Sequence, residues 1–173
     1  MAKPAADIDI RIEFDGWRDD PPSAEEFACE AALAAIGLAG PPATPATPIE
    51  LSILLTGDAA VAELNARWRG KEGPTNVLSF PGDTTPGNGP PVLLGDVVIA
   101  FETLHAEALS AEIPATDHLR HLVIHGVLHL LGYDHENDID AAVMEAREIE
   151  LLGTLGVPDP YAAADRRVEN AVQ

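Results

Sequence analysis

Residues 125–135 read His125-Gly126-Val127-Leu128-His129-Leu130-Leu131-Gly132-Tyr133-Asp134-His135, and this stretch predicts both the central element of the fold and a metal site. His125 and His129 are four residues apart in an apolar run, so on a helix their side chains lie on one face. Gly132 tolerates a left-handed backbone and is a natural end for that helix. The chain can then turn back and bring His135 to the same ion. Three neutral imidazoles with one open position are the ligands expected of a catalytic zinc ion.

The alternative is that these histidines are ordinary residues of a packed core. A single histidine on an apolar helix is more often that, and two at a spacing of four can occur by chance. A third histidine just after a helix end favours a shared ion. The spacing resembles the H-E-x-x-H pattern of zinc proteases, in which the glutamate is the general base. Gly126 stands at that position here, so a conventional zinc protease is not expected.

The elements around this stretch alternate between strands and helices. The central helix is expected from about Thr116 to Leu131, and it should be buried because apolar side chains surround most of it. Asp7–Phe14 alternates strictly between apolar and charged residues, as a half-buried strand does. A helix capped by Asp58 should end near Trp68. Further strands are predicted at 49–56, 77–80 and 92–100, and further helices at 23–37, 101–111 and 138–155.

Length and composition indicate a single globular domain over residues 1–173, with loops at 39–48 and 81–91 and a frayed tail at 162–173. Cys29 is the only cysteine, so no disulfide can form within the chain. That agrees with a reducing cytoplasm. The N-terminus lacks the basic start and apolar centre of a signal peptide. No apolar stretch approaches the ~18 residues of a membrane span. We therefore expect a cytoplasmic protein.

The charge of the chain argues against a nucleic-acid partner when it is taken alone. The formal net charge is −19, whereas nucleic-acid binding usually begins with a basic surface. The few cations are not evenly spread, since Arg67, Arg69 and Lys71 fall within five residues. This cluster is the best candidate for contact with phosphate. The alternative interpretation is that these cations lie at the solvated end of a helix, where they also interact favourably with the helix dipole.

The string from His125 to His135 resembles the signature of the bacterial rRNA maturation factor YbeY, a family of metal-dependent endoribonucleases. Two further stretches match that family. One runs from Arg69-Gly70-Lys71 to Thr75-Asn76-Val77-Leu78-Ser79-Phe80-Pro81, and the other is Leu94-Gly95-Asp96-Val97-Val98-Ile99. The resemblance covers about residues 50 to 161. It implies an α+β domain whose central mixed sheet packs with helices, with the metal site on a buried helix and the loop that follows it.

The resemblance also implies the activity. Members are similar in cleaving single-stranded RNA, and they act in 16S rRNA 3′-end maturation and ribosome quality control. The implied site has one Zn²⁺ held by His125, His129 and His135, although imidazole also suits nickel, copper and iron. Arg69 would contact the phosphate, with Arg67 a lesser candidate. The implied partners are rRNA of the small ribosomal subunit and ribosomal or assembly proteins, with neither DNA nor a membrane.

Several points stay open at the level of sequence. His118 and His121 lie on the same stripe as His125 and can line the site, bond to its ligands or face solvent. Asp134 can orient an imidazole, accept a proton or cap the following turn. Two rival functions are a three-histidine hydrolase of another substrate class and a non-enzymatic ribosome assembly factor. The acidity of the chain favours a substrate other than nucleic acid in the first case and basic ribosomal partners in the second.

Overall fold

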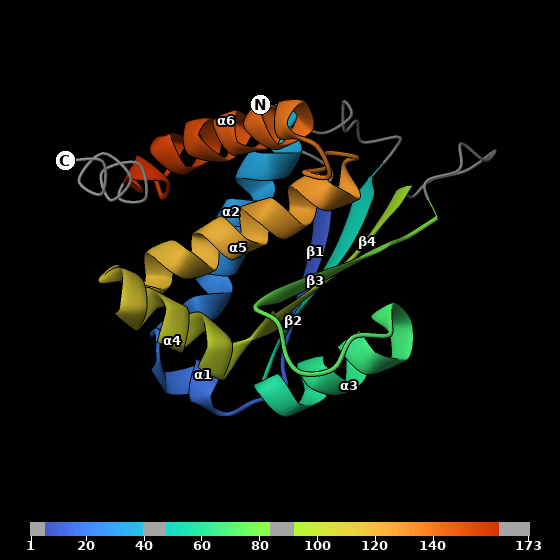
Figure 1. Ribbon diagram of the computed structural model, residues 1–173, viewed down its shortest axis with the longest axis vertical. Helices are drawn as coiled ribbons and strands as arrows, with labels where there is room; N and C mark the ends of the chain where they lie inside the picture. Colours follow the sequence, from blue (N-terminus) through green and yellow to red (C-terminus); the bar gives the residue numbers. More distant parts are fainter. Residues whose placement is uncertain (1–5, 40–47, 84–91, 163–173) are drawn as a thin grey trace.

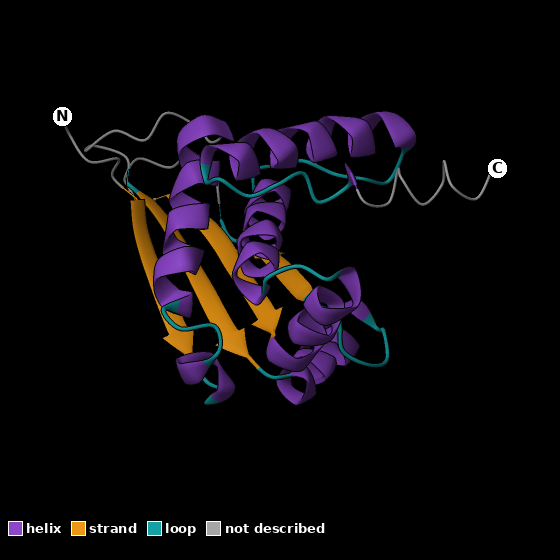
Figure 2. Cartoon of the chain, turned by 90° about the vertical axis from the view of Figure 1, so that its left-hand side faces the viewer, coloured by secondary structure: helices purple, strands orange, loops and turns teal. Residues whose placement is uncertain are grey.

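The computed structural model describes residues 6–39, 48–83 and 92–162, which form an α+β domain with one four-stranded sheet (Figures 1 and 2). The strands are β1 (Ala6–Ile12), β2 (Ile49–Thr56), β3 (Val77–Pro81) and β4 (Val92–Ala100). The helices are α1 (Gly16–Asp19), α2 (Ala24–Ala39), α3 (Asp58–Arg69), α4 (Phe101–Ala111), α5 (Ala115–Leu130) and α6 (Asp138–Thr154). In these described ranges no helix combines the length and apolar character needed to cross a membrane.

The sheet has the strand order β1-β2-β4-β3 and is mixed, as the family resemblance implied. β1 pairs with β2 and β2 with β4 in parallel, whereas β3 pairs with β4 in the antiparallel direction. β3 is therefore an edge strand, and its pairing partner β4 is a central one. The buried run Val97-Val98-Ile99-Ala100 in β4 agrees with the expectation that this strand is covered on both faces.

The two faces of the sheet are covered very differently. Because side chains alternate along a strand, Val97 and Ile99 point into the main core, while Val98 and Ala100 point to the opposite face. The main core lies between the sheet and the helices α2 and α5, which Figure 1 shows crossing one another, with α6 across them. The opposite face carries a smaller cluster under α3, in which Val61 packs against Leu78 and Val98.

Helix α5 is the centre of the domain. Eight of its sixteen residues are buried, and they come from most of its circumference. Its burial was predicted from this apolar character, and its bounds differ from the prediction by one residue at each end. A helix packed on all sides is a rigid platform, which a binding site needs if its ligands are to keep their geometry.

One sequence prediction is wrong, one short helix was not predicted, and three predicted segments lie mostly outside the described residues. Asp58 does not cap its own helix: Gly57 is the N-cap of α3, and the Asp58 carboxylate accepts hydrogen bonds from the backbone and hydroxyl of Thr103 in α4. The short helix α1 was not predicted, because four residues are too few for a periodic pattern. Most of the predicted loops 39–48 and 81–91, and of the tail 162–173, lie outside the described residues.

Candidate metal centre and its cleft

The three histidines of the opening stretch come together in the structure. His125 and His129 project from the last turns of α5, and their Nε2 atoms are 3.1 Å apart. His135 reaches them from the loop between α5 and α6. One nitrogen from each of the three rings lies within 4.8 Å of the other two. The two helical imidazoles are partly buried and His135 is exposed.

The local backbone explains how the third histidine arrives. Gly132 follows the end of α5 with a φ of 96°, the left-handed conformation that its sequence position predicted. The amide of Tyr133 donates to the carbonyl of Leu128, which turns the chain back over the helix end. The Asp134 carboxylate accepts a hydrogen bond from the His135 amide at 2.7 Å. Asp134 therefore shapes the loop that carries His135.

The chemistry and spacing of these nitrogens fit a transition-metal ion. Zinc-bound nitrogens lie about 2.0–2.1 Å from the ion, which puts them roughly 3.3 Å apart in a tetrahedral site. His125 and His129 already have that spacing. A ring nitrogen of the exposed His135 lies within 4.8 Å of both, close enough for a small movement of its loop to bring it to the same ion. Burial lowers the pKa of His129, and the neighbouring imidazoles of His125 and His135 lower it further. A neutral imidazole is the form that binds metal.

A buried carboxylate supports this centre from behind. Glu148 lies on α6 and is only 1% exposed. Its Oε1 is 2.5 Å from Nδ1 of His125, and its Oε2 is 2.9 Å from Nε2 of His121. Tyr161, beyond the end of α6, donates its hydroxyl hydrogen to the same Oε2. His121 is therefore hydrogen-bonded to Glu148, which is itself hydrogen-bonded to the candidate ligand His125. Of the roles that the sequence left open for His121, this is the one of bonding to the support of a ligand.

The electrostatics of this group follow from its partners. Burial by itself raises the pKa of the Glu148 carboxyl, but hydrogen bonds from His121, His125 and Tyr161 outweigh it and bring the pKa to about 2. Burial raises the pKa of the Tyr161 hydroxyl, and the bond to Glu148 raises it further. Glu148 is therefore a carboxylate and Tyr161 a neutral donor near neutral pH.

The sequence reasoning missed Glu148 and Tyr161, although one signal was available. The buried residues of α6 are Met144, Glu148, Leu151 and Leu152. Their spacing is that of the inward face of an amphipathic helix, so an acidic residue occupies a core position. A charge placed there needs a partner, because burying an unpaired charge is costly. The four histidines of α5 were the partners to consider.

The three histidines open into a cleft of about 650 Å³ between the end of α5, β3 and the segment after α3. Arg69 and Lys71 line the same cleft, together with Asn76 and Ser79. Gly70 ends α3 in a left-handed conformation with a φ of 63°, and this turn leaves Arg69 and Lys71 on either side of it. The structure thus places two of the three predicted basic residues, Arg69 and Lys71, around one cavity with the predicted metal ligands.

Ser79 fixes the position of Arg69 relative to the histidines. Nη2 of Arg69 donates to the backbone oxygen of Ser79 at 2.9 Å. The hydroxyl of Ser79 in turn donates to the backbone oxygen of Gly126 at 2.9 Å. Gly126 adjoins His125, so two hydrogen bonds link the guanidinium to the ligand-bearing helix. An arginine has five N–H donors, and this contact uses one of them.

Gly126 is explained by packing. A Cβ atom at this position would lie 2.8 Å from Cγ1 of Val97 and 3.2 Å from the Ser79 hydroxyl oxygen. The position that carries the general base in zinc proteases therefore faces the sheet, and there is no room for a glutamate. This agrees with the sequence-based argument against a conventional zinc protease.

Arg67 and His118 lie outside the cleft, and so does His105, for which the sequence indicated no role. The Arg67 guanidinium sits 5.3 Å from the centre of the Trp68 ring, and Arg67 is not among the described residues that line the cavity. His118 bonds through Nε2 to Glu107 at 2.7 Å, and burial lowers its pKa. His105 bonds to the backbone oxygen of Phe101 and packs on its ring. His118 and His105 thus have structural partners of their own.

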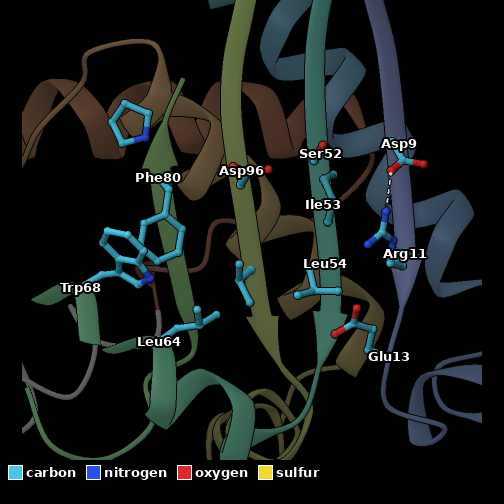
Figure 3. Close-up of a pocket in the computed structure, with 12 residues that line it drawn as sticks. Asp9, Arg11, Glu13, Ser52, Ile53, Leu54, Leu64, Trp68, Phe80 and Asp96 are labelled. Atoms are coloured by element: carbon cyan, nitrogen blue, oxygen red, sulfur yellow. Dashed lines mark ion pairs between the residues drawn. The ribbon is translucent and has the colours of Figure 1, made fainter. Parts of the chain in front are cut away.

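A second hollow of about 610 Å³ lies on the other face of the sheet (Figure 3). Apolar side chains from α3 and the sheet line one side of it, including the 64% exposed Trp68. Asp9, Glu13 and Asp96 line it as well, with Arg11 the one cation among its described lining residues. It contains none of the three histidines, so the chemistry predicted from the sequence belongs to the other cleft.

Comparison with known proteins gives a consistent result. Residues 25–156 match the protein family described as "Endoribonuclease YbeY". A protein of that name from Rhodospirillum rubrum is 47% identical over 169 residues, covering 91% of this chain and 84% of its own length. One from Paramagnetospirillum magneticum is 50% identical over 159 residues, covering 90% of this chain and 95% of its own length.

A solved structure supports the fold. The solution structure of TM1509 from Thermotoga maritima matches with a TM-score of 0.52 and 21% sequence identity, covering 93% of each chain. At that identity the likeness concerns the arrangement of helices and strands alone. It agrees with the mixed sheet and packed helices described above.

Proposed function

The chain belongs to the YbeY endoribonuclease family, and from this premise we propose that it hydrolyses single-stranded RNA at the three-histidine centre, in the 3′-end maturation of 16S rRNA and in ribosome quality control. The observation that carries the proposal is that the three histidines and Arg69 line one cleft. A metal site and a phosphate-binding side chain in the same cavity suit the metal-assisted cleavage of a phosphodiester.

In this proposal His125, His129 and His135 hold one Zn²⁺ ion. When bound, such an ion supplies a Lewis acid and lowers the pKa of its water to roughly 7. The two histidines on α5 keep their nitrogens in place because the helix is buried. His135 closes the site from its loop. Nickel, copper and iron also bind imidazole. The metal that is bound to the protein therefore has to be identified whenever its activity is measured.

Arg69 is the residue that would act on the phosphate. A guanidinium binds phosphate oxygens with a planar fork of donors and keeps its charge at any relevant pH. The hydrogen bond to Ser79 holds Arg69 at the cleft and leaves other donors free of that contact. Lys71 would add a second positive charge as a point contact. Arg67 has no place in this contact, because its guanidinium lies over Trp68.

The acidity of the chain fits this assignment once the charges are located. With a net charge of −19, most of the surface repels RNA, so a strand would approach where Arg69 and Lys71 stand. The remaining acidic surface suits basic ribosomal proteins of the small subunit in the cytoplasm. A partner of this kind would hold the enzyme beside its rRNA substrate.

The test is the cleavage of a single-stranded rRNA 3′-end fragment by the purified protein, with bound metal measured in every sample. His129→Ala is prepared identically, because it removes one ligand from the rigid helix. His105→Gln is the control, since His105 lies outside the cleft. We expect cleavage by the parent and by His105→Gln, together with loss of both metal and cleavage in His129→Ala.

Other outcomes would contradict the proposal in different ways. Equal cleavage by all three proteins would identify a contaminating ribonuclease. Near-stoichiometric zinc in His129→Ala would remove that histidine from the site. A parent that binds metal but cleaves neither the single strand nor its duplex would favour the assembly-factor alternative.

A further inference from the structure

The four histidines on one face of α5 do not have equivalent surroundings. His118, His121, His125 and His129 follow one another at spacings of three or four residues, and any adjacent pair could share an ion on spacing alone. The structure separates them by their hydrogen-bond partners. His118 bonds to Glu107, whereas His121 and His125 both bond to Glu148.

Glu148 uses its two oxygens for different purposes. Oε1 faces Nδ1 of His125 at 2.5 Å. Oε2 faces Nε2 of His121 and the hydroxyl of Tyr161. An ionised carboxylate can only accept hydrogen bonds, so the nitrogens that face it carry hydrogen.

This arrangement decides which nitrogen of each ring has a free lone pair. In His125 the hydrogen sits on Nδ1, which leaves Nε2 as the bare nitrogen, and this Nε2 lies 3.1 Å from Nε2 of His129. In His121 the hydrogen sits on Nε2, so the nitrogen at the outer end of the ring is not available to an ion.

We propose that Glu148 is the positioning residue of the metal centre, which selects the Nδ1–H form of His125 and so presents Nε2 of that ring to the ion. His121 and Tyr161 hold Oε2, which leaves Oε1 to bind His125. The inference rests on the proposed metal site and adds to it a residue 23 positions from His125. Carboxylates that bind the far nitrogen of a ligating histidine typically change metal affinity by about 10–100-fold when they are lost.

Tyr161 has a secondary part in the same arrangement. It lies seven residues beyond the end of α6, and its hydroxyl bonds to Oε2 of Glu148 and approaches Nε2 of His121 at 3.4 Å. Its removal would leave Oε2 bonded to His121 alone and would not touch the bond from Oε1 to His125. We therefore expect the loss of Tyr161 to weaken the metal site less than the loss of the Glu148 charge.

The first measurement is zinc affinity by competition with a chromophoric chelator. Glu148→Gln keeps the shape of the side chain and removes its charge, and Tyr161→Phe removes one hydrogen bond. Glu145→Gln is the matched control, because Glu145 is an exposed acid on the same helix. We expect zinc binding to weaken about 10–100-fold in Glu148→Gln, by a smaller factor in Tyr161→Phe, and not at all in Glu145→Gln.

The second measurement reads the hydrogen position directly. In the parent protein labelled with ¹⁵N-histidine, NMR assigns each imidazole hydrogen to Nδ1 or Nε2. The inference requires His125 to carry it on Nδ1 and His121 on Nε2. A role of Glu148 in stability alone would not fix these positions. If Glu148→Gln fails to fold, the parent spectrum and the affinity of Tyr161→Phe decide the matter.

The outcomes separate this inference from the proposed function. Unchanged zinc affinity in Glu148→Gln, or a His125 hydrogen on Nε2, overturns the role of Glu148 and leaves the nuclease proposal standing. A parent that shows the expected affinities and hydrogen positions but cleaves no RNA overturns the nuclease proposal and leaves the role of Glu148 standing. A parent that binds no zinc overturns both.

Discussion

Arg69 and Arg67 are two residues apart and carry the same charge, but only Arg69 lines the histidine cleft. Because Arg69 would stabilise charge that develops on the phosphate, we expect Arg69→Ala to lower kcat/KM for RNA cleavage by about 100-fold. Zinc content should not change, since Arg69 contacts none of the three histidines in the described hydrogen bonds. Arg67→Ala should lose little activity. Equal losses in the two variants would indicate a general effect of charge in place of a specific contact.

Gly126 and Gly37 both lie within helices, but we expect substitution by alanine to change the stability of the protein in opposite directions at the two positions. A Cβ at Gly126 would lie 2.8 Å from Val97, which belongs to a central strand and cannot easily move. We expect Gly126→Ala to lower the free energy of unfolding by about 1–3 kcal/mol, as overpacking does. Gly37 has no described heavy atom within 4 Å of its added Cβ. Gly37→Ala should raise stability by about 0.5–1 kcal/mol. Urea denaturation of both variants measures the difference.

The residues of the centre differ in how far the sequence could predict them. His125, His129 and His135 fall within eleven consecutive positions, so spacing and one glycine were enough to bring them together. Arg69 and Glu148 lie on other elements, and no local pattern states how those elements pack against α5. The family resemblance supplied Arg69, whose catalytic role stays a prediction. Glu148 required the packing of α6 on α5, which only the structure gives.

Among the helices and strands, those with a long apolar pattern were predicted within one or two residues, β1 and α5 among them. The order of the strands was not predictable, because it depends on contacts between distant segments. β3 is an example: its short run of apolar residues gave a strand, but its antiparallel place at the edge of the sheet follows from pairing with β4. That edge position is what sets Ser79 between Arg69 and the ligand helix.

The start of α6 allows a test at this level. Asn137 is its N-cap, and the side-chain oxygen accepts a hydrogen bond from the Asp140 amide at 2.9 Å. Removing such an acceptor leaves an amide of the first turn unpaired. We expect Asn137→Ala to lower the free energy of unfolding by about 1 kcal/mol. Asn137→Ser keeps an acceptor and should retain most of the stability. Equal losses in both variants would contradict the capping role.

For the molecule as a whole, composition alone was misleading about the partner. A net charge of −19 argues against RNA, and nothing in composition shows that Arg69 and Lys71 stand beside the histidines while Asp9, Glu13 and Asp96 line the opposite face of the sheet. The fold separates the two kinds of surface. This separation depends on the alternation of side chains along β1 and β4 and on the turn at Gly70.

Global stability should depend on pH through Glu148. Its pKa is about 2 in the folded protein and 4.5 as the ordinary value, so below pH 4.5 the unfolded chain binds more protons than the folded one. The stabilisation is present above pH 4.5 and is lost as pH falls through 2, with a total on the order of 3 kcal/mol. His118 and His129, whose pKa values are lowered, add an earlier loss below pH 6.5.

Urea denaturation of zinc-free protein between pH 6 and 3 measures this dependence. Glu148→Gln cannot titrate at this position, so its stability should fall less steeply below pH 4.5 than that of the parent. Glu145→Gln removes an exposed carboxyl from the same helix and should keep the slope of the parent. A parallel pH dependence in the parent and Glu148→Gln would show that other carboxyl groups control acid unfolding.

The contrast between a buried α5 and an exposed His135 bears on how quickly an ion can be exchanged. Two of the nitrogens belong to a helix packed into the core, so their backbone keeps its position whether or not an ion is bound. The third stands on a surface loop after Gly132 and can swing away without disturbing that core. The residence time of the ion would then be governed by the loop, and its capture and release would pass through a two-nitrogen state with the helix intact.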